Sequence, residues 1–286
     1  FNIAINPGAT EACNTIDDNC NGQKDETCAG GSCSNMSLGS TANPGSGNLY
    51  HDQALFQTST LGFTLSYNSI DNYTSPLGKG WTHNWNLFLF SNPDGSIGLK
   101  QADGRIVYFK LNNGIYYPEA ESGEDSYITY NNGAYILTEK NGTTYTFNAT
   151  TGKLTSIKDR NGNTTTLSYT GEALTSITDL SGRRITLTYD ASNRISTITD
   201  LNGNVYSFSY ANDALSGIEQ SAISYQQSAW NYTYDSNGQL LTKTDPSGYT
   251  TTYSYDSEGK IISSQDPEGK TKAISYEPSA NTVTVT

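Results

Sequence analysis

The sequence predicts an all-β protein, in which an antiparallel meander of hairpins curls into one long sheet. Three observations carry this prediction. A turn signal recurs at a nearly constant spacing, the segments between turns alternate bulky with small polar residues, and the composition includes 27 Gly and 21 Tyr but only one Met. Tyr suits half-exposed strands because it joins a large ring to a polar tip.

The turn signal has the form Asp-x-x-Gly and recurs through the second half of the chain. It occurs at residues 159–162, 179–182, 200–203, 245–248 and 266–269, so that successive Asp residues are 20, 21, 45 and 21 positions apart. Asp can accept hydrogen bonds from backbone amides further along, and Gly tolerates a positive φ. The step of 45 indicates two repeats whose middle turn, at 219–222, has lost the signal. A fixed period near 20 indicates one hairpin unit stacked many times.

Each unit contains two short strands. Residues 165–169, 185–189 and 206–210 alternate bulky with small polar side chains, which places one face toward a core. The pieces that follow, at 174–177, 195–198 and 215–218, carry apolar residues three positions apart. Strict alternation would put these on opposite faces, so we predict a bulge or bend in the second strand. We expect Leu167, Leu187, Phe208 and Tyr255 to face a common core.

A Tyr-Asp pair is interleaved with these turns at residues 189–190, 234–235 and 255–256. With the Asp-x-x-Gly turns, this pattern resembles the YD-repeat (Rhs-type) family of bacterial surface and secreted proteins, shared with the teneurin adhesion receptors. Residues 61–69, 76–85 and 103–109 resemble the segment that commonly precedes such repeats, so the resemblance covers about residues 48–286. It implies a spiral β-sheet that wraps, in complete family members, into a shell around a cargo. About six repeats are too few to enclose a cavity, which leaves open edges.

Five regions follow along the chain. We expect an extended strand at 1–9, a Cys- and Asp-rich metal-binding module at 10–33, a linker at 34–47, a β-rich domain at 48–150 and YD repeats at 151–286. The linker is predicted from its Gly, Ser, Asn and Pro content.

The module at 10–33 is the one segment with metal chemistry. Oxygen side chains alternate there and are followed by Gly22, a spacing that suits a Ca²⁺ loop. In a typical Ca²⁺ loop the twelfth position is an acidic ligand, but here that position is Cys28. Glu26 or Glu11 would therefore complete the coordination shell of the ion. The segment resembles a short metal-binding motif of bacterial secreted proteins that is sometimes associated with copper, but hard oxygen ligands without His or Met favour Ca²⁺. An acidic turn without an ion stays open as the alternative. The predicted ligands are Asp17, Asn19, Asn21, the carbonyl of Gln23, Asp25 and Glu26.

All four cysteines lie in this module, at Cys13, Cys20, Cys28 and Cys33. Their clustering predicts disulfides and an oxidising compartment, and hence an extracellular or cell-surface protein. We favour the pairs Cys13–Cys20 and Cys28–Cys33 among the three possible connectivities. Phe1 at the first position indicates a processed or trimmed chain.

Charge and motifs exclude several function classes. The net charge of −12 argues against nucleic-acid partners, and no apolar run reaches the length of a membrane span. No catalytic motif is present, and aromatic packing is the expected role of His83, one of two histidines with His51. The acidic pairs Glu119 with Glu121 and Glu124 with Asp125 are those that a glycosidase would need, but they lie in a polar loop. We therefore expect that the protein is not an enzyme.

The function predicted is that of a secreted or cell-surface structural or interaction protein. Its edges can pair with the period-two segments at 1–5 and 280–286, which would give a homo-oligomer or a fibre by strand addition. Other surface proteins or glycans are further possible partners. The alternative is the N-terminal shell part of an Rhs-type polymorphic toxin carrier. A carbohydrate-binding or carbohydrate-active protein, using its Tyr-rich strands, is the distant third.

Overall fold

The computed structural model describes residues 42–43, 46–119, 122–221, 228–277 and 282–285. The predictions on residues 1–41, namely the N-terminal strand, the metal ligands and the disulfides, lie outside the described residues. The described residues form an all-β structure, as predicted. No helix in them is long and apolar enough to cross a membrane.

A small sheet comes first and is called the inner sheet below. Its four antiparallel strands follow the order β1-β2-β3-β6. A two-stranded hairpin, β4 with β5, projects from the connection between β3 and β6. The strands are β1 (Ala42–Asn43), β2 (Asn48–Gln57), β3 (Gly62–Asn68), β4 (Thr74–Ser75), β5 (Gly78–Lys79) and β6 (Trp81–His83).

The rest of the described chain forms an antiparallel meander, the outer sheet, whose 19 strands β7 to β25 each pair with their neighbours in sequence, and β26 adds to its last strand. Its first strands are β7 (Phe88–Ser91), β8 (Ile97–Lys100), β9 (Ile106–Asn112), β10 (Ile115–Pro118), β11 (Ser126–Asn131), β12 (Ala134–Glu139), β13 (Thr144–Asn148) and β14 (Leu154–Lys158). The sheet runs without interruption through residues 148–154, where the sequence predicted the repeats to begin.

The predicted repeats continue the same meander. Their strands are β15 (Thr164–Thr170), β16 (Ala173–Thr178), β17 (Arg184–Tyr189), β18 (Ile195–Thr199), β19 (Val205–Ala211), β20 (Ala214–Ser221), β21 (Ser228–Tyr234), β22 (Leu240–Thr244), β23 (Thr250–Tyr255), β24 (Ile261–Gln265), β25 (Thr271–Glu277) and β26 (Thr282–Val285). β20 pairs with β21, so the step of 45 residues does hold two repeats.

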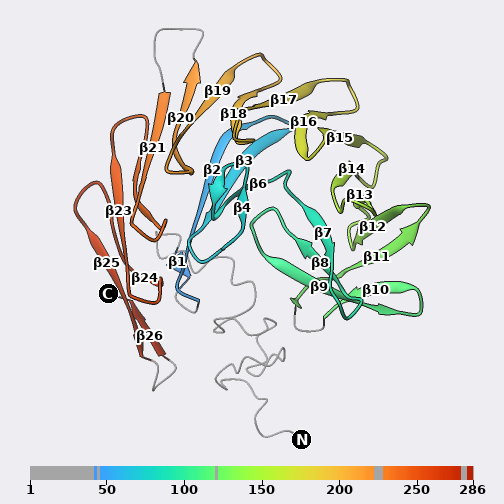
Figure 1. Ribbon diagram of the computed structural model, residues 1–286, viewed down its shortest axis with the longest axis horizontal. Helices are drawn as coiled ribbons and strands as arrows, with labels where there is room; N and C mark the ends of the chain where they lie inside the picture. Colours follow the sequence, from blue (N-terminus) through green and yellow to red (C-terminus); the bar gives the residue numbers. More distant parts are fainter. Residues whose placement is uncertain (1–41, 44–45, 120–121, 222–227, 278–281, 286) are drawn as a thin grey trace, which may run out of the picture.

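The outer sheet curls around the inner sheet (Figure 1). Strands β7 to β14 make a tight turn, in which the backbone N–H of Leu89 on β7 donates to the Gly152 carbonyl between β13 and β14, at 2.8 Å. Strands β15 to β26 continue as a wider arm past the inner sheet. Within the described residues no strand pairing joins β26 to β7, so the spiral is open.

The predicted bulge is present in the five hairpins from β15–β16 to β23–β24. Tyr169 pairs with Leu174 and Ser168 with Ser176, so Thr175 is an extra residue on the second strand. The same shift recurs opposite the corresponding tyrosines of the four following hairpins. Because of the extra residue, Leu174 and Ile177 are both buried although they are three positions apart.

One continuous core lies between the two sheets. Leu167, Leu187 and Phe208 are buried in it, as predicted. Tyr255 is only half-buried against this core, and Tyr253, two residues earlier, takes the position equivalent to Leu187. Both tyrosines point to the same face because side chains alternate along a strand.

Candidate functional site: the contact between the inner sheet and the repeats

Eight turns in the described part of the outer sheet share one hydrogen-bond pattern. In each, one carboxylate oxygen of an Asp accepts the backbone N–H groups two and four residues further along, at 2.8–3.0 Å. The Asp carbonyl accepts the N–H of the residue between them. The Asp-x-x-Gly and Tyr-Asp signals therefore specify the same turn. The aspartates are Asp159, Asp179, Asp190, Asp200, Asp235, Asp245, Asp256 and Asp266.

These hydrogen bonds favour the ionised carboxylate. The backbone N–H of Arg194 lowers the pKa of Asp190 below its usual range, against a smaller opposing effect of desolvation. The side-chain amide of Asn163 does the same for the pKa of Asp159. Both turns thus keep their full hydrogen bonding at neutral pH, with the carboxylate oxygens engaged in holding the turn.

A ladder of tyrosines joins each repeat to the one before it. The hydroxyl of the tyrosine opposite the bulge, called the repeat tyrosine, donates to a backbone carbonyl of the preceding hairpin at 2.6–2.9 Å. The residue that offers this carbonyl, called the anchor, is a buried Leu or Ile. The tyrosine–anchor pairs are Tyr169 with Leu154, Tyr189 with Leu174, Tyr210 with Ile195, Tyr234 with Leu215 and Tyr255 with Leu240.

The inner sheet and its β4–β5 hairpin accept the N–H groups of two anchors, Ile195 and Leu240, and that of Ile261, which takes the equivalent position opposite the next repeat tyrosine. The N–H of Ile195 donates to the carbonyl of Pro76 at 2.9 Å, and that of Ile261 donates to the carbonyl of Gly47 at 2.9 Å. The N–H of Leu240 donates to the hydroxyl of Tyr67 at 3.0 Å. A bulge leaves backbone groups outside the ladder, and here a second sheet satisfies them. These three residues therefore connect three repeats directly to the inner sheet and its hairpin.

Aromatic side chains fill the space between these hydrogen bonds. Trp81 is fully buried, and its indole N–H donates to the Tyr234 hydroxyl at 2.8 Å. Its ring lies 5.2 Å from that of Tyr67 and 5.0 Å, edge to face, from that of Tyr232. These separations are within the range of favourable aromatic pairs. The Trp81-containing segment that the sequence identified thus forms the centre of the contact.

The two histidines belong to this packing. Burial lowers the pKa of His83 to about 3, and burial together with the charge of Lys243 lowers the pKa of His51 to about 3. The His83 ring lies 4.9 Å from Phe63, and the His51 ring lies 6.3 Å from Trp81. In the described residues, His51 Nε2 has no hydrogen-bond partner. Both rings are therefore neutral at physiological pH, as expected for aromatic packing.

The acidic residues that were considered for a glycosidase pair form ion pairs and hydrogen bonds with neighbouring side chains. Glu119 pairs with Lys110 at 2.8 Å, Asp125 pairs with Lys140 at 2.5 Å, and Glu124 accepts a hydrogen bond from Gln101. Glu121 lies outside the described residues, as do the predicted metal ligands. Among the residues that the structure describes, no group of three His, Cys, Asp or Glu side chains is placed to hold a metal ion.

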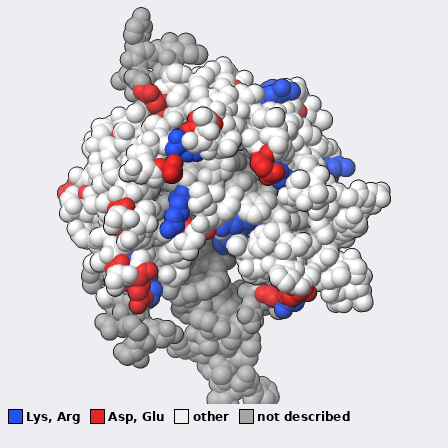
Figure 2. All heavy atoms as spheres, in the orientation of Figure 1, with Lys and Arg blue, Asp and Glu red and all other residues white. Residues whose placement is uncertain are grey.

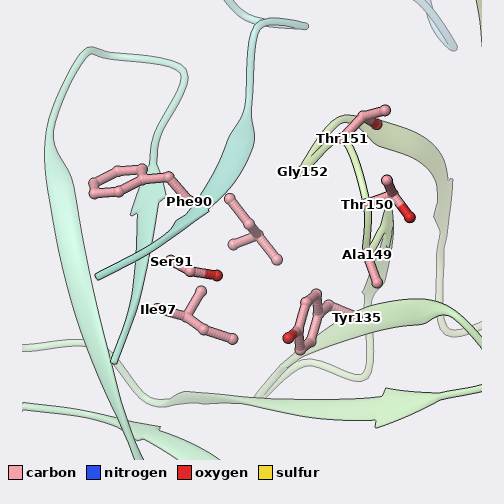
Figure 3. Close-up of a pocket in the computed structure, with 9 residues that line it drawn as sticks. Phe90, Ser91, Ile97, Tyr135, Ala149, Thr150, Thr151 and Gly152 are labelled. Carbon is pink, nitrogen blue, oxygen red and sulfur yellow. The ribbon is translucent and has the colours of Figure 1, made fainter. Parts of the chain in front are cut away.

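Charged groups are scattered as small clusters over the visible face rather than gathered in one patch (Figure 2). One cavity of about 250 Å³ opens between β7, β8, β12 and the turn at 149–152. Its lining contains no charged side chain, and Tyr135, Ile97 and Ser91 lie around its interior (Figure 3).

Comparison with known families accounts for this architecture. The family profile "RHS Repeat" matches residues 170–205 and 234–271. The chain therefore contains YD repeats of the Rhs type. The profile "Domain of unknown function (DUF6531)" matches residues 39–109, which include the inner sheet, β7, β8 and the first part of β9. The profile "Putative metal-binding motif" matches residues 1–26. A sequence search of curated proteins gave no match.

Several solved structures show a distant similarity to this chain. This YD-repeat chain is similar to the crystal structure of TcdB2-TccC3, with 17% identity and a TM-score of 0.37 over 81% of this chain and 14% of that chain. It is also similar to the Photorhabdus luminescens Tc holotoxin pore, with 18% identity and a TM-score of 0.32 over 84% of this chain and 15% of that chain. The chain spans about a seventh of the length of these structures.

Proposed function

We propose that this chain forms the first turn of a spiral YD-repeat shell, whose inner sheet closes one end, in a secreted or cell-surface protein. The observation that supports the proposal is the set of three hydrogen bonds from the backbone N–H groups of Ile195, Leu240 and Ile261 to Pro76, Tyr67 and Gly47, respectively. They make the inner sheet a fixed filling of the concave face rather than a separate domain. The proposal gives the chain a structural role without catalysis.

The proposal accounts for the open end of the spiral. Further repeats, where the gene encodes them, would add to the edge at β26 by the same tyrosine–anchor contact that joins the repeats described above. The enclosed volume would then be available for a cargo, as in a toxin carrier. The first test is electron cryomicroscopy of the complete gene product. We expect a closed shell with residues 48–86 filling one end, and a flat or extended sheet would contradict the proposal.

A fibre built by strand addition is the second candidate. In the described residues β26 has a partner on one side only, and an unpaired edge can accept a strand from another molecule. The expected donor is the segment at 1–5. Light scattering on the intact chain and on a variant lacking residues 1–9 separates the candidates. If particle size grows with concentration for the intact chain only, the fibre is supported. If both the intact chain and the variant remain monomeric, the fibre is excluded.

The N-terminal module is proposed to bind Ca²⁺ through Asp17, Asn19, Asn21 and Asp25. The support is the alternating oxygen side chains in the segment that matches a metal-binding motif. Disulfides at the four cysteines would hold this loop in an oxidising environment, which agrees with the proposed location outside the cell.

A further inference from the structure

Both histidines of the chain lie on one face of the inner sheet, and the outer sheet contains none. His51 on β2 pairs with Tyr67 on β3, which pairs with Trp81 on β6, so these three side chains point to the same side. His83 follows Trp81 by two positions and shares that side. It is the side that contacts the repeats, through the hydrogen bonds of Tyr67 and Trp81. The side chains with an ordinary pKa of about 6.5 therefore all belong to this contact.

The folded geometry has no place for a second proton on His83. Its Nδ1 accepts the backbone N–H of Trp85 at 3.3 Å, and the ring is buried against Phe63. A proton on Nδ1 would place two N–H groups against each other and bury a charge among apolar groups. Burial accounts for the low pKa of this ring, and no charged group among the described residues acts on it. Protonation of His83 therefore requires the contact to open.

His51 is equally unsuited to a positive charge. Its Nε2 is buried and has no hydrogen-bond partner in the described residues. The groups that face the ring are Tyr67 from β3, Trp81 from β6 and Lys243 from β22. Burial lowers the pKa of His51, and the charge of Lys243 lowers it further. Asp245, the carboxylate that acts on Lys243, does not act on His51, so a second cation here would have no counter-ion among the described residues.

We propose that acidification releases the inner sheet from the repeats while the outer sheet stays folded. Because a proton on either ring fits only the released sheet, docking is complete above pH 6.5 and weakens as the pH falls below it. The outer sheet lacks histidine, and the pKa of turn aspartates such as Asp159 and Asp190 is held below the usual range, so their hydrogen bonds persist at about pH 5. In the proposed shell, release would open the end that the inner sheet closes. That consequence rests on the proposed function, whereas release itself is measured on the chain alone.

The size of the effect follows from the two pKa values. Each ring has a pKa of about 3 in the docked sheet and of 6.5 once it is released. At pH 5.0 protonation therefore favours release about 30-fold for each ring, and about 1,000-fold for both, relative to neutral pH. The effect stops growing at about pH 3, because below it the docked rings bind the proton as well.

Hydrogen exchange at the Leu240 N–H measures release directly, because this N–H donates to Tyr67 across the contact. The quantity compared is the protection factor, the exchange rate of the amide in an unstructured chain divided by the observed rate, which removes the pH dependence of exchange itself. Between pH 7.4 and pH 5.0 the protection factor should fall about 1,000-fold. On further acidification to pH 4.0, tryptophan fluorescence should shift to longer wavelength as Trp81 is exposed, while circular dichroism still reports the sheet.

Variants assign the effect to the histidines. His51→Phe keeps an aromatic ring in the same place but cannot gain a proton, so the protection factor of Leu240 should fall about 30-fold over the same interval, the share of His83 alone. Lys243→Met removes the cation that faces His51 and should also reduce the fall. Lys158→Met, at an exposed position, is the control and should leave it unchanged. Either of the first two variants supplies the test if the other does not fold.

Three outcomes would overturn the inference. The protection factor of Leu240 could be independent of pH, or the fluorescence could stay unchanged down to pH 4.0, and in both cases the sheet stays docked. Fluorescence and circular dichroism could also change together, in which case acid unfolds the whole chain instead of releasing one sheet. A closed shell whose inner sheet stays docked in acid would overturn this inference and leave the proposed function intact, so the two failures are distinguishable.

Discussion

The hydrogen bond between Tyr67 and Leu240 offers a direct measure of how firmly the inner sheet holds the repeats. Tyr67 is 1% exposed, and its hydroxyl is the acceptor for the Leu240 N–H at 3.0 Å. Tyr67→Phe keeps the ring that packs against Trp81 but removes the acceptor. The Leu240 N–H is then buried without a partner, because its place at the bulge lies outside the ladder of the outer sheet.

A buried donor left without an acceptor costs about 1–3 kcal/mol. Taking the middle of that range, the free energy of unfolding should fall by about 2 kcal/mol. Urea unfolding followed by fluorescence measures this loss. Tyr249→Phe is the control, since Tyr249 is 63% exposed and changes at exposed positions usually stay within about 0.5 kcal/mol.

Hydrogen exchange gives a second readout at the atom concerned. If the Leu240 N–H exchanges through local opening of the contact, a loss of about 2 kcal/mol should speed its exchange about 30-fold. The amide of Leu187, in a repeat that does not contact Tyr67, should keep its rate. Unchanged stability together with an unchanged Leu240 exchange rate would show that the contact does not hold the two sheets together.

Three further predictions concern pH, a turn and the N-terminal module. Because the pKa of His51 and His83 is about 3 in the folded chain and 6.5 without the fold, stability should be full above pH 6.5 and fall on acidification. The fall should reach about 4 kcal/mol at pH 5.0 by urea unfolding, and a pH-independent midpoint would refute this. Gly203 has a φ of +85°, so Gly203→Ala should cost about 1–2 kcal/mol, measured against the native chain by the same method. Calorimetry should detect Ca²⁺ binding to the oxidised full chain but not to Asp17→Asn, and no heat in either would reject the site.

The repeat architecture could be predicted from sequence because its causes are local. The Asp turns use hydrogen bonds within four residues, and the bulge follows from apolar residues three positions apart, as at Leu174 and Ile177. What the spacing did not reveal is that Tyr189-Asp190 and Asp179-x-x-Gly182 make the same turn. In the first of these turns Asn193, with a φ of 60°, takes the place of Gly. Asn is the non-glycine residue that best tolerates this conformation, so the sequence did contain a signal.

The contact between the sheets could not be predicted in the same way. Tyr67 and Leu240 are 173 positions apart, and no periodic pattern links them. The residues that make the contact were visible only as an aromatic-rich segment around Trp81. Backbone carbonyls such as those of Pro76 and Gly47 carry no side-chain signature at all. The tyrosine–anchor ladder was missed for the same reason, since its acceptors are carbonyls.

The anchors show why the tyrosine–anchor ladder and the contact with the inner sheet belong together. An anchor such as Leu240 offers its carbonyl to the tyrosine of the next repeat, Tyr255, and its N–H to the inner sheet through Tyr67. The bulge frees both groups from the ordinary ladder, so one local irregularity supplies the sites for sheet growth and for docking. In a regular strand both groups would already be hydrogen-bonded within the sheet. Displacing one anchor should therefore weaken both contacts at once, which couples the curvature of the spiral to the presence of the inner sheet.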